Sequence, residues 1–156
     1  MSEAGRTVIR QQQSCGGGAL PWNDKITYAR LMYEHDLAAY RRACNMNGPV
    51  FFDRGIVDVV AYLQMEHLPV PETLQTAASH CRYHTTAFIL PPWPQIYRRD
   101  QERQQDLPTA IATYHAMIKT YLQYGYTLVH VPRLPVAQRA VFILNAITSE
   151  HRSKKD

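Results

Sequence analysis

Three short apolar runs separated by longer helical patterns constrain the fold of this chain most strongly. They are Val50–Phe52, Thr86–Leu90 and Thr127–Val131. Val50–Phe52 shows no alternation of apolar and polar residues, which is typical of a strand buried on both faces of a parallel sheet. Three such strands alternating with helices predict an α/β fold with a parallel sheet.

Helical patterns fill the segments around these runs. We expect helices over residues 3–14, 24–46, 57–64, 107–124 and 136–149, and one more that starts at Pro71. Asp24 is a good N-cap, Pro71 suits the first position of a helix, and Gly125 is expected to end the helix before it. The expected helices and strands together predict a single domain over residues 1–150, followed by a polar tail over residues 151–156.

Composition narrows the class of protein. Of the 156 residues 46% are apolar, which is enough for a core of ordinary size. The net charge of +4 suits an anionic ligand such as a nucleotide, but there is no long Lys/Arg run of the kind that binds nucleic acid. No apolar run approaches the ~18 residues of a membrane span. Cys15, Cys44 and Cys81 are widely spaced, which indicates a reduced, cytoplasmic setting.

Ligands of such sheets bind beyond the carboxyl ends of the strands, and Asp53 and Arg54 follow Val50–Phe52 directly. In phosphoryl-transfer enzymes an acid at this place holds Mg²⁺ or positions the attacking hydroxyl. The arginine is suited to a phosphate. The alternative is structural: Asp53 caps the following helix, and Arg54 pairs with a nearby carboxylate.

Two other segments carry weaker signals. Residues 95–106, between an expected strand and an expected helix, are polar and charged. They could form a lid whose arginines close over phosphates. The alternative is an exposed helix start with surface salt bridges. His80, Cys81 and His84 are close in sequence, but no fourth zinc ligand accompanies them. Gly16–Gly18 follows a helix and is not a phosphate loop.

Several short motifs recur in the same order in one family. They are Glu3-Ala4-Gly5-Arg6, Gly17-Gly18-Ala19-Leu20-Pro21-Trp22, Val50-Phe51-Phe52-Asp53-Arg54-Gly55, Pro91-Pro92-Trp93-Pro94, and Ile96-Tyr97 with Asp100, Glu102 and Arg103. In these the chain resembles, over nearly its whole length, the ribosylnicotinamide-kinase-like AAA domain family of small P-loop ATPases.

The resemblance implies a three-layer P-loop NTPase-like fold, a parallel sheet flanked by helices, with ATP and Mg²⁺ as ligands. It also implies a kinase-like site. In that site Asp53 is the acid after the third strand and the Mg²⁺ ligand, Arg54 lies beside it, and Glu3 faces a small-molecule acceptor. The nucleotide-binding arginines of the lid are Arg103 with Arg98 or Arg99.

The chain departs from the family at its start. Members begin with a strand, the phosphate loop, a helix and a second strand, a unit of roughly 30 residues or more. No stretch of the 156 residues matches the loop pattern G-x-x-x-x-G-K-[ST]. We therefore expect that this unit is missing, that the chain alone is inactive, and that a longer form is an ATPase or small-molecule kinase.

The missing unit also affects the sheet. In the kinase-like branch of the family the first strand lies between Val50–Phe52 and Thr86–Leu90. Its absence predicts unpaired backbone groups, and hence a marginal or aggregation-prone chain, or one completed by a second copy or another polypeptide. The alternative function is a degenerate, non-catalytic binding or interaction module.

Overall fold

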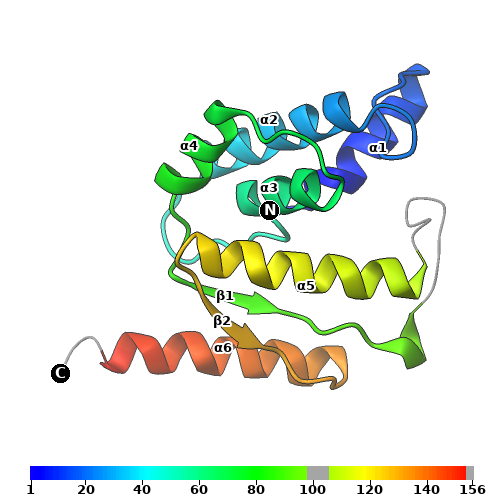
Figure 1. The fold of residues 1–156 in the computed structure, drawn as a ribbon. Helices are drawn as coiled ribbons and strands as arrows, with labels where there is room; N and C mark the ends of the chain where they lie inside the picture. The colour runs from blue at the N-terminus through cyan, green and yellow to red at the C-terminus, as the bar shows by residue number, and fades with distance from the viewer. Residues whose placement is uncertain (98–105, 154–156) are drawn as a thin grey trace.

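A computed structural model describes residues 1–97 and 106–153 of the chain (Figure 1). Its elements, in chain order, are α1 (Ala4–Cys15), α2 (Lys25–Ala43), α3 (Ile56–Met65), α4 (Glu72–His80), β1 (Thr86–Ile89), the short 3-10 helix η1 (Pro94–Ile96), α5 (Leu107–Gln123), β2 (Thr127–His130) and α6 (Val136–Ser153). The expected helices are therefore present, each within a few residues of its expected bounds. Helix α6 continues through Ser153, so it includes the first residues of the expected tail.

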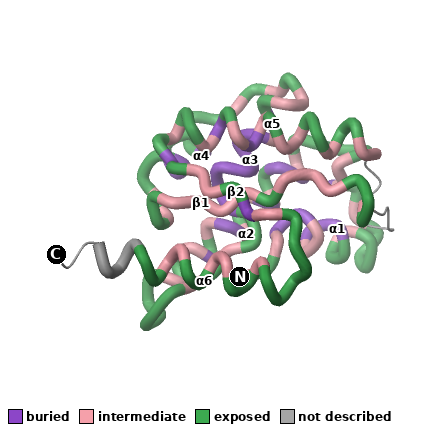
Figure 2. Tube along the Cα trace, turned by 90° about the horizontal axis from the view of Figure 1, so that it is seen from below, coloured by how far each residue is buried: buried purple, intermediate pink, exposed green. Residues whose placement is uncertain are grey.

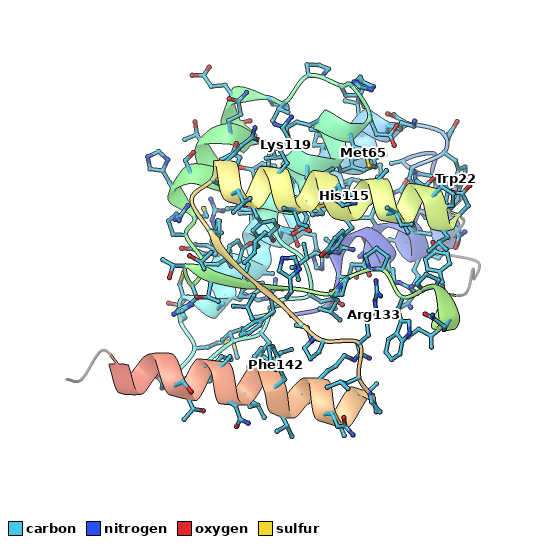
Figure 3. The ribbon with its side chains drawn as sticks, turned by 60° about the horizontal axis from the view of Figure 1, so that its bottom comes forward. Trp22, Met65, His115, Lys119, Arg133 and Phe142 are labelled. Carbon is cyan, nitrogen blue, oxygen red and sulfur yellow. The ribbon has the colours of Figure 1, made fainter. Side chains whose placement is uncertain are left out.

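The described residues contain one sheet, formed by β1 and β2. The two strands pair in parallel with Thr86 opposite Thr127, which confirms two of the three expected strands. Helix α5 lies on one face of the pair and α6 on the other, with Phe142 of α6 pointing toward the strands (Figures 1 and 3). This arrangement is compatible with a P-loop-like α/β fold.

The third expected strand is not formed. Residues 50–52 belong to no strand, and Phe51 is 50% exposed. β1 is only partly buried, and the ends of β2 are exposed. The expectation of three strands buried on both faces was therefore wrong. The described sheet has only two strands, so it is too narrow for either of its faces to be covered completely. The backbone around residues 50–52 forms its hydrogen bonds with Met1 and not with β1 or β2.

The hydrophobic core lies among the helices instead. Figure 2 shows α3 as the most continuously buried element, and it packs against α2, α4 and α5. Its buried side chains are Ile56, Val57, Val59, Val60, Ala61 and Leu63. A helix that is apolar on nearly all sides has to be enclosed on all sides, and this requirement buries α3 from Gly55 onward, while Asp53 and Arg54 just before it stay exposed.

Three helix-end signals have clear structural counterparts. The Asp24 carboxylate accepts a hydrogen bond from the Thr27 N–H at 2.9 Å, which confirms its role as the N-cap of α2. Gly125 has a φ of 74° and closes α5 in the left-handed conformation. Pro71 directly precedes α4, as its N-cap residue, and so lies one position before the place expected for it.

Within residues 1–97 and 106–153, none of the helices has both the length and the apolar character needed to cross a bilayer.

Candidate functional site

The first residues of the chain run side by side with residues 51–53, which lie far from them in the sequence. The Met1 amino group donates a hydrogen bond to the Phe51 carbonyl, and the Asp53 N–H donates to the Met1 carbonyl at 3.0 Å. Two bonds in this pattern are those of a parallel strand pair. Residues 1–3 and 51–53 therefore point in one direction and bring Glu3 and Asp53 to the same end.

A pocket of about 360 Å³ opens at this end. It is lined by Ser2, Glu3, Arg6, Thr7, Arg10 and Asp53. Two of the expected site acids, Glu3 and Asp53, thus share one pocket although 50 residues separate them in the sequence. The lining combines two carboxylates, two guanidinium groups and two hydroxyls, so it offers ligands for a cation and donors for an anion.

The two arginines were not anticipated. Glu3, Arg6, Thr7 and Arg10 have the i, i+3, i+4, i+7 spacing of one helix face, and α1 presents that face to the pocket. The Arg6 guanidinium lies 3.3 Å from a Glu3 carboxylate oxygen. The polar periodicity of residues 3–10 was the signal in the sequence that could have revealed them.

Arg54 lies in a neighbouring network rather than in the pocket lining. Its φ of 72° is in the left-handed region, which a residue with a side chain adopts at a cost. Its guanidinium contacts the Asp58 carboxylate at 3.2 Å. Burial alone would lower the pKa of Arg54, but the charges of Asp58 and Glu3 raise it above its ordinary value. The pairing with Asp58 matches the structural alternative for Arg54.

Asp58 organises the turn that follows Asp53. Besides Arg54, its carboxylate accepts hydrogen bonds from the Gly55 N–H at 2.9 Å and from the Tyr121 hydroxyl at 2.6 Å. Burial, followed by the charge and the hydrogen bond of Asp58, raises the pKa of Tyr121 well above its ordinary value, so this hydroxyl remains a donor. The largely buried Asp58 thus connects the site turn to α5.

Position 55 requires glycine because the Tyr83 side chain lies very close to its backbone. A Cβ at this position would lie 2.8 Å from the Tyr83 hydroxyl oxygen and 2.9 Å from a carbon of its ring. The same hydroxyl accepts a hydrogen bond from the Ile56 N–H at 3.3 Å. Tyr83 therefore fixes the start of α3 from the side of β1, and no larger residue fits between them without displacing the ring.

Replacing Gly55 by alanine is expected to lower the free energy of unfolding by about 1–3 kcal/mol, the usual cost of overpacking. Urea denaturation of the variant measures this loss. In a Tyr83→Ala background the same replacement should cost clearly less, because the clash is removed. An equal cost in both backgrounds would show that the Tyr83 ring is not the reason for glycine.

Asp36 of α2 is a buried acid that is not part of the pocket lining. It is 4% exposed, and the Nδ1 atom of His35 lies 3.8 Å from its carboxylate. Burial, followed by the charges of Asp58 and Glu3, raises the pKa of Asp36 to about 7. Burial also lowers the pKa of His35, so the imidazole carries no compensating charge at neutral pH. Sequence patterns gave no signal for this residue.

The expected lid arginines Arg98, Arg99 and Arg103 lie outside the described residues. The described ends of that segment are close together, since the Tyr97 hydroxyl donates a hydrogen bond to the Asp106 carbonyl at 3.3 Å. Asp106 also caps α5 by accepting from the Thr109 N–H. The role of the segment as a lid remains a prediction.

The pocket residues suit Mg²⁺ in type. This ion is bound through one or two carboxylates together with phosphate oxygens and water, and Glu3 and Asp53 supply two carboxylates. Within residues 1–97 and 106–153, the pocket included, His, Cys, Asp and Glu side chains form no cluster of three suited to a metal. His80, Cys81 and His84 accordingly do not gather around a common point.

Comparison with known proteins assigns the chain to a family. A family model described as an AAA domain matches residues 1–139. The comparisons with curated proteins and with solved structures found no match. Because the family match extends over most of the 156 residues, the chain belongs to the AAA domain family, whose members are P-loop nucleotide-binding domains.

Proposed function

We propose that the pocket lined by Glu3, Arg6, Arg10 and Asp53 binds the phosphates and Mg²⁺ of ATP. The observation that carries the proposal is the meeting of two carboxylates and two arginines in one pocket of a P-loop-family domain. Guanidinium groups bind phosphate oxygens in bidentate fashion, and carboxylates hold the ion that neutralises the phosphates. The mixed lining suits a metal–phosphate ligand better than a cation or an anion alone.

The proposed reaction is phosphoryl transfer to a small-molecule acceptor, or hydrolysis of ATP. Asp53 would hold Mg²⁺ or orient the attacking hydroxyl, and Glu3 would face the acceptor. Mg²⁺, when bound, would neutralise charge that develops on the transferred phosphoryl group. Arg54, held by Asp58 at 3.2 Å, would contribute its charge from the edge of the site. Lid arginines at 98, 99 and 103 would complete the nucleotide contacts.

The 156 residues contain no G-x-x-x-x-G-K-[ST] motif. In P-loop enzymes the backbone amides and lysine of that motif supply much of the phosphate binding. We therefore propose that this chain forms the acid-and-arginine side of the site, binds ATP weakly, and does not turn it over alone. A segment that supplies the remaining phosphate contacts, from a longer form of this protein or from a partner chain, would complete the site.

Titration with MgATP should reveal a weak but localised site. We expect binding in the roughly millimolar range, with NMR amide shifts concentrated at residues 2–10 and 53–55. Arg10→Glu should weaken binding at least about tenfold, because a charge-assisted hydrogen bond contributes about 1.5–3 kcal/mol. Arg30→Glu makes the same charge change on the exposed face of α2, outside the pocket, and should leave the affinity unchanged.

Three outcomes would contradict this proposal. Amide shifts that appear away from the pocket would place the ligand elsewhere. Equal weakening by Arg10→Glu and Arg30→Glu would reduce the effect to net charge. An absence of shifts at millimolar MgATP would favour the alternative of a non-catalytic interaction module.

A further inference from the structure

The link between α2 and the pocket residue Asp53 contains the dipeptide Asn47-Gly48. Both residues are exposed, and neither belongs to a helix or a strand. Gly48 has a φ of 83°, in the left-handed region, and a Cβ at this position would meet nothing within 4 Å. The residue after Asn47 thus carries no side chain, and the space beside it is open.

An asparagine side chain can react with the backbone nitrogen of the next residue. Attack of that nitrogen on the side-chain carbonyl carbon closes a five-membered ring. The two atoms belong to neighbouring residues, so the attack needs only a suitable set of torsion angles. A glycine in the next position permits these angles because it has no Cβ. Hydrogen bonds that hold either reacting group oppose the attack, since they must be broken first.

Asparagine occurs at positions 23, 45, 47 and 145, and hydrogen bonds restrain the first of these. The Asn23 side-chain amide donates to the Gly18 carbonyl at 2.8 Å. The attacking nitrogen at this site would be that of Asp24, whose N–H donates to the Leu20 carbonyl at 3.0 Å. Both reacting groups are therefore held in place.

Asn45 and Asn145 are also restrained. The Asn45 side chain donates to the Arg41 carbonyl at 3.2 Å, and the N–H of the next residue, Met46, donates to the Ala43 carbonyl at 3.0 Å. Asn145 lies inside α6, where backbone N–H groups are bonded along the helix. An attack at either position would first have to break these bonds.

Asn47 differs from the other three. Among the residues that the structure describes, none forms a hydrogen bond with the Asn47 side chain or with the Gly48 N–H. The backbone is anchored before this point by Met46, which donates to the last turn of α2. It is anchored after this point by Phe51, whose carbonyl accepts from the Met1 amino group. The segment between these two anchors is free to adopt the geometry of attack.

We infer that Asn47 is a site of spontaneous deamidation in the folded protein, with water as the reactant. The Gly48 nitrogen forms a bond to the side-chain carbonyl carbon of Asn47 and loses its proton, while the amide nitrogen leaves as ammonia. Water then opens the resulting succinimide ring. Opening at the side-chain carbonyl gives aspartate. Opening at the main-chain carbonyl gives isoaspartate, in which the main chain runs through the former side-chain carbon.

Deamidation changes the charge and the backbone of this link. Each event replaces a neutral amide by a carboxylate and lowers the net charge of +4 by one. The isoaspartyl product also adds a carbon atom to the main chain. Because the backbone of residues 47–50 forms no hydrogen bond within the described part of the chain, the pairing of residues 1–3 with 51–53 should persist. The modified protein should therefore stay folded and accumulate.

The experiment incubates the wild-type chain in mildly alkaline buffer, both folded and unfolded in guanidinium chloride, and follows its tryptic peptides by mass spectrometry. Trypsin cuts after Arg42 and Arg54, so one peptide contains both Asn45 and Asn47. We expect the mass gain of an NH2-to-OH exchange at Asn47 and not at Asn45. The isoaspartyl product should accept a methyl group from S-adenosylmethionine when an isoaspartyl methyltransferase is added. The folded and unfolded rates should agree within about tenfold, because an unrestrained loop opens at almost no cost in free energy.

Asn47→Gln is the matched control and should keep its amide, since its longer side chain would have to close a six-membered ring. The inference is overturned if Asn47 reacts more than about tenfold more slowly in the folded chain than in the unfolded one. It is also overturned if Asn23 or Asn45 reacts as fast as Asn47 in the folded chain. The thermal midpoint should stay constant as isoaspartate accumulates, and a falling midpoint would contradict the tolerance of the link.

Discussion

Replacing Asp58 by alanine is expected to lower the free energy of unfolding by about 3 kcal/mol. The change removes the acceptor of the Gly55 N–H and the Tyr121 hydroxyl, leaving two donors unpaired inside the protein. A hydrogen bond to a charged group contributes about 1.5–3 kcal/mol. The contact with Arg54 adds less, since that side chain is 45% exposed and solvent screens its charge. Urea denaturation monitored by circular dichroism measures the loss.

A double-mutant cycle identifies the source of this loss. Tyr121→Phe alone should be destabilising, but in the Asp58→Ala background it should cost little or even help, because the hydroxyl then has no partner. Asp53→Ala is the matched control, since it removes an exposed acid from the same turn. A loss for Asp58→Ala no larger than that for Asp53→Ala would show that the network does not hold the site turn in place.

Replacing Asp36 by asparagine is expected to stabilise the protein at pH 8 by up to about 4 kcal/mol. The pKa of Asp36 rises from an ordinary 3.8 to about 7 in the folded protein. The unfolded chain therefore loses the proton above about pH 4 while the folded chain keeps it until about pH 7. The stability that comes from this bound proton is present below pH 4 and is lost as the pH rises through 7.

Asparagine keeps the size of the side chain but has no proton to lose, so this pH dependence should disappear. Thermal unfolding of both proteins between pH 5 and pH 8 measures the effect. The wild-type midpoint should fall over this range by more than that of Asp36→Asn. Asp53→Asn, which changes an exposed acid, should retain the wild-type slope. Parallel curves for the wild type and Asp36→Asn would show that Asp36 ionises normally in its buried position.

Local signals located most of the secondary structure. Asp24, Gly125 and the apolar periodicity are sufficient for the helix positions, because caps and amphipathic faces act within a few residues. The parallel pairing of the runs beginning at Thr86 and Thr127 also followed from their alternation with helices. The same reasoning failed for Val50–Phe52, since an apolar run becomes a strand only where neighbouring strands accept its hydrogen bonds.

The candidate site was only partly predictable. Asp53 was selected by its place after an expected strand and Glu3 by the family resemblance, and the structure puts both in one pocket. Arg6 and Arg10 could have been found from their spacing, because it puts them on the same helix face as Glu3. Asp58 was missed although its contacts with Gly55 and Arg54 are local, three and four residues away in the sequence. Only its hydrogen bond from Tyr121 depends on the packing of α3 against α5.

The sequence by itself determined the helices, the two paired strands, the mild positive charge and the absence of a phosphate-loop motif within these 156 residues. These features depend on residue type and on spacing over a few positions. Only the tertiary structure decided that residues 1–3 lie beside residues 51–53, that Asp36 is buried, and that the Tyr40 hydroxyl reaches the Arg82 carbonyl. Such contacts join residues dozens of positions apart, and they form because enclosing the apolar helix α3 forces the surrounding elements together.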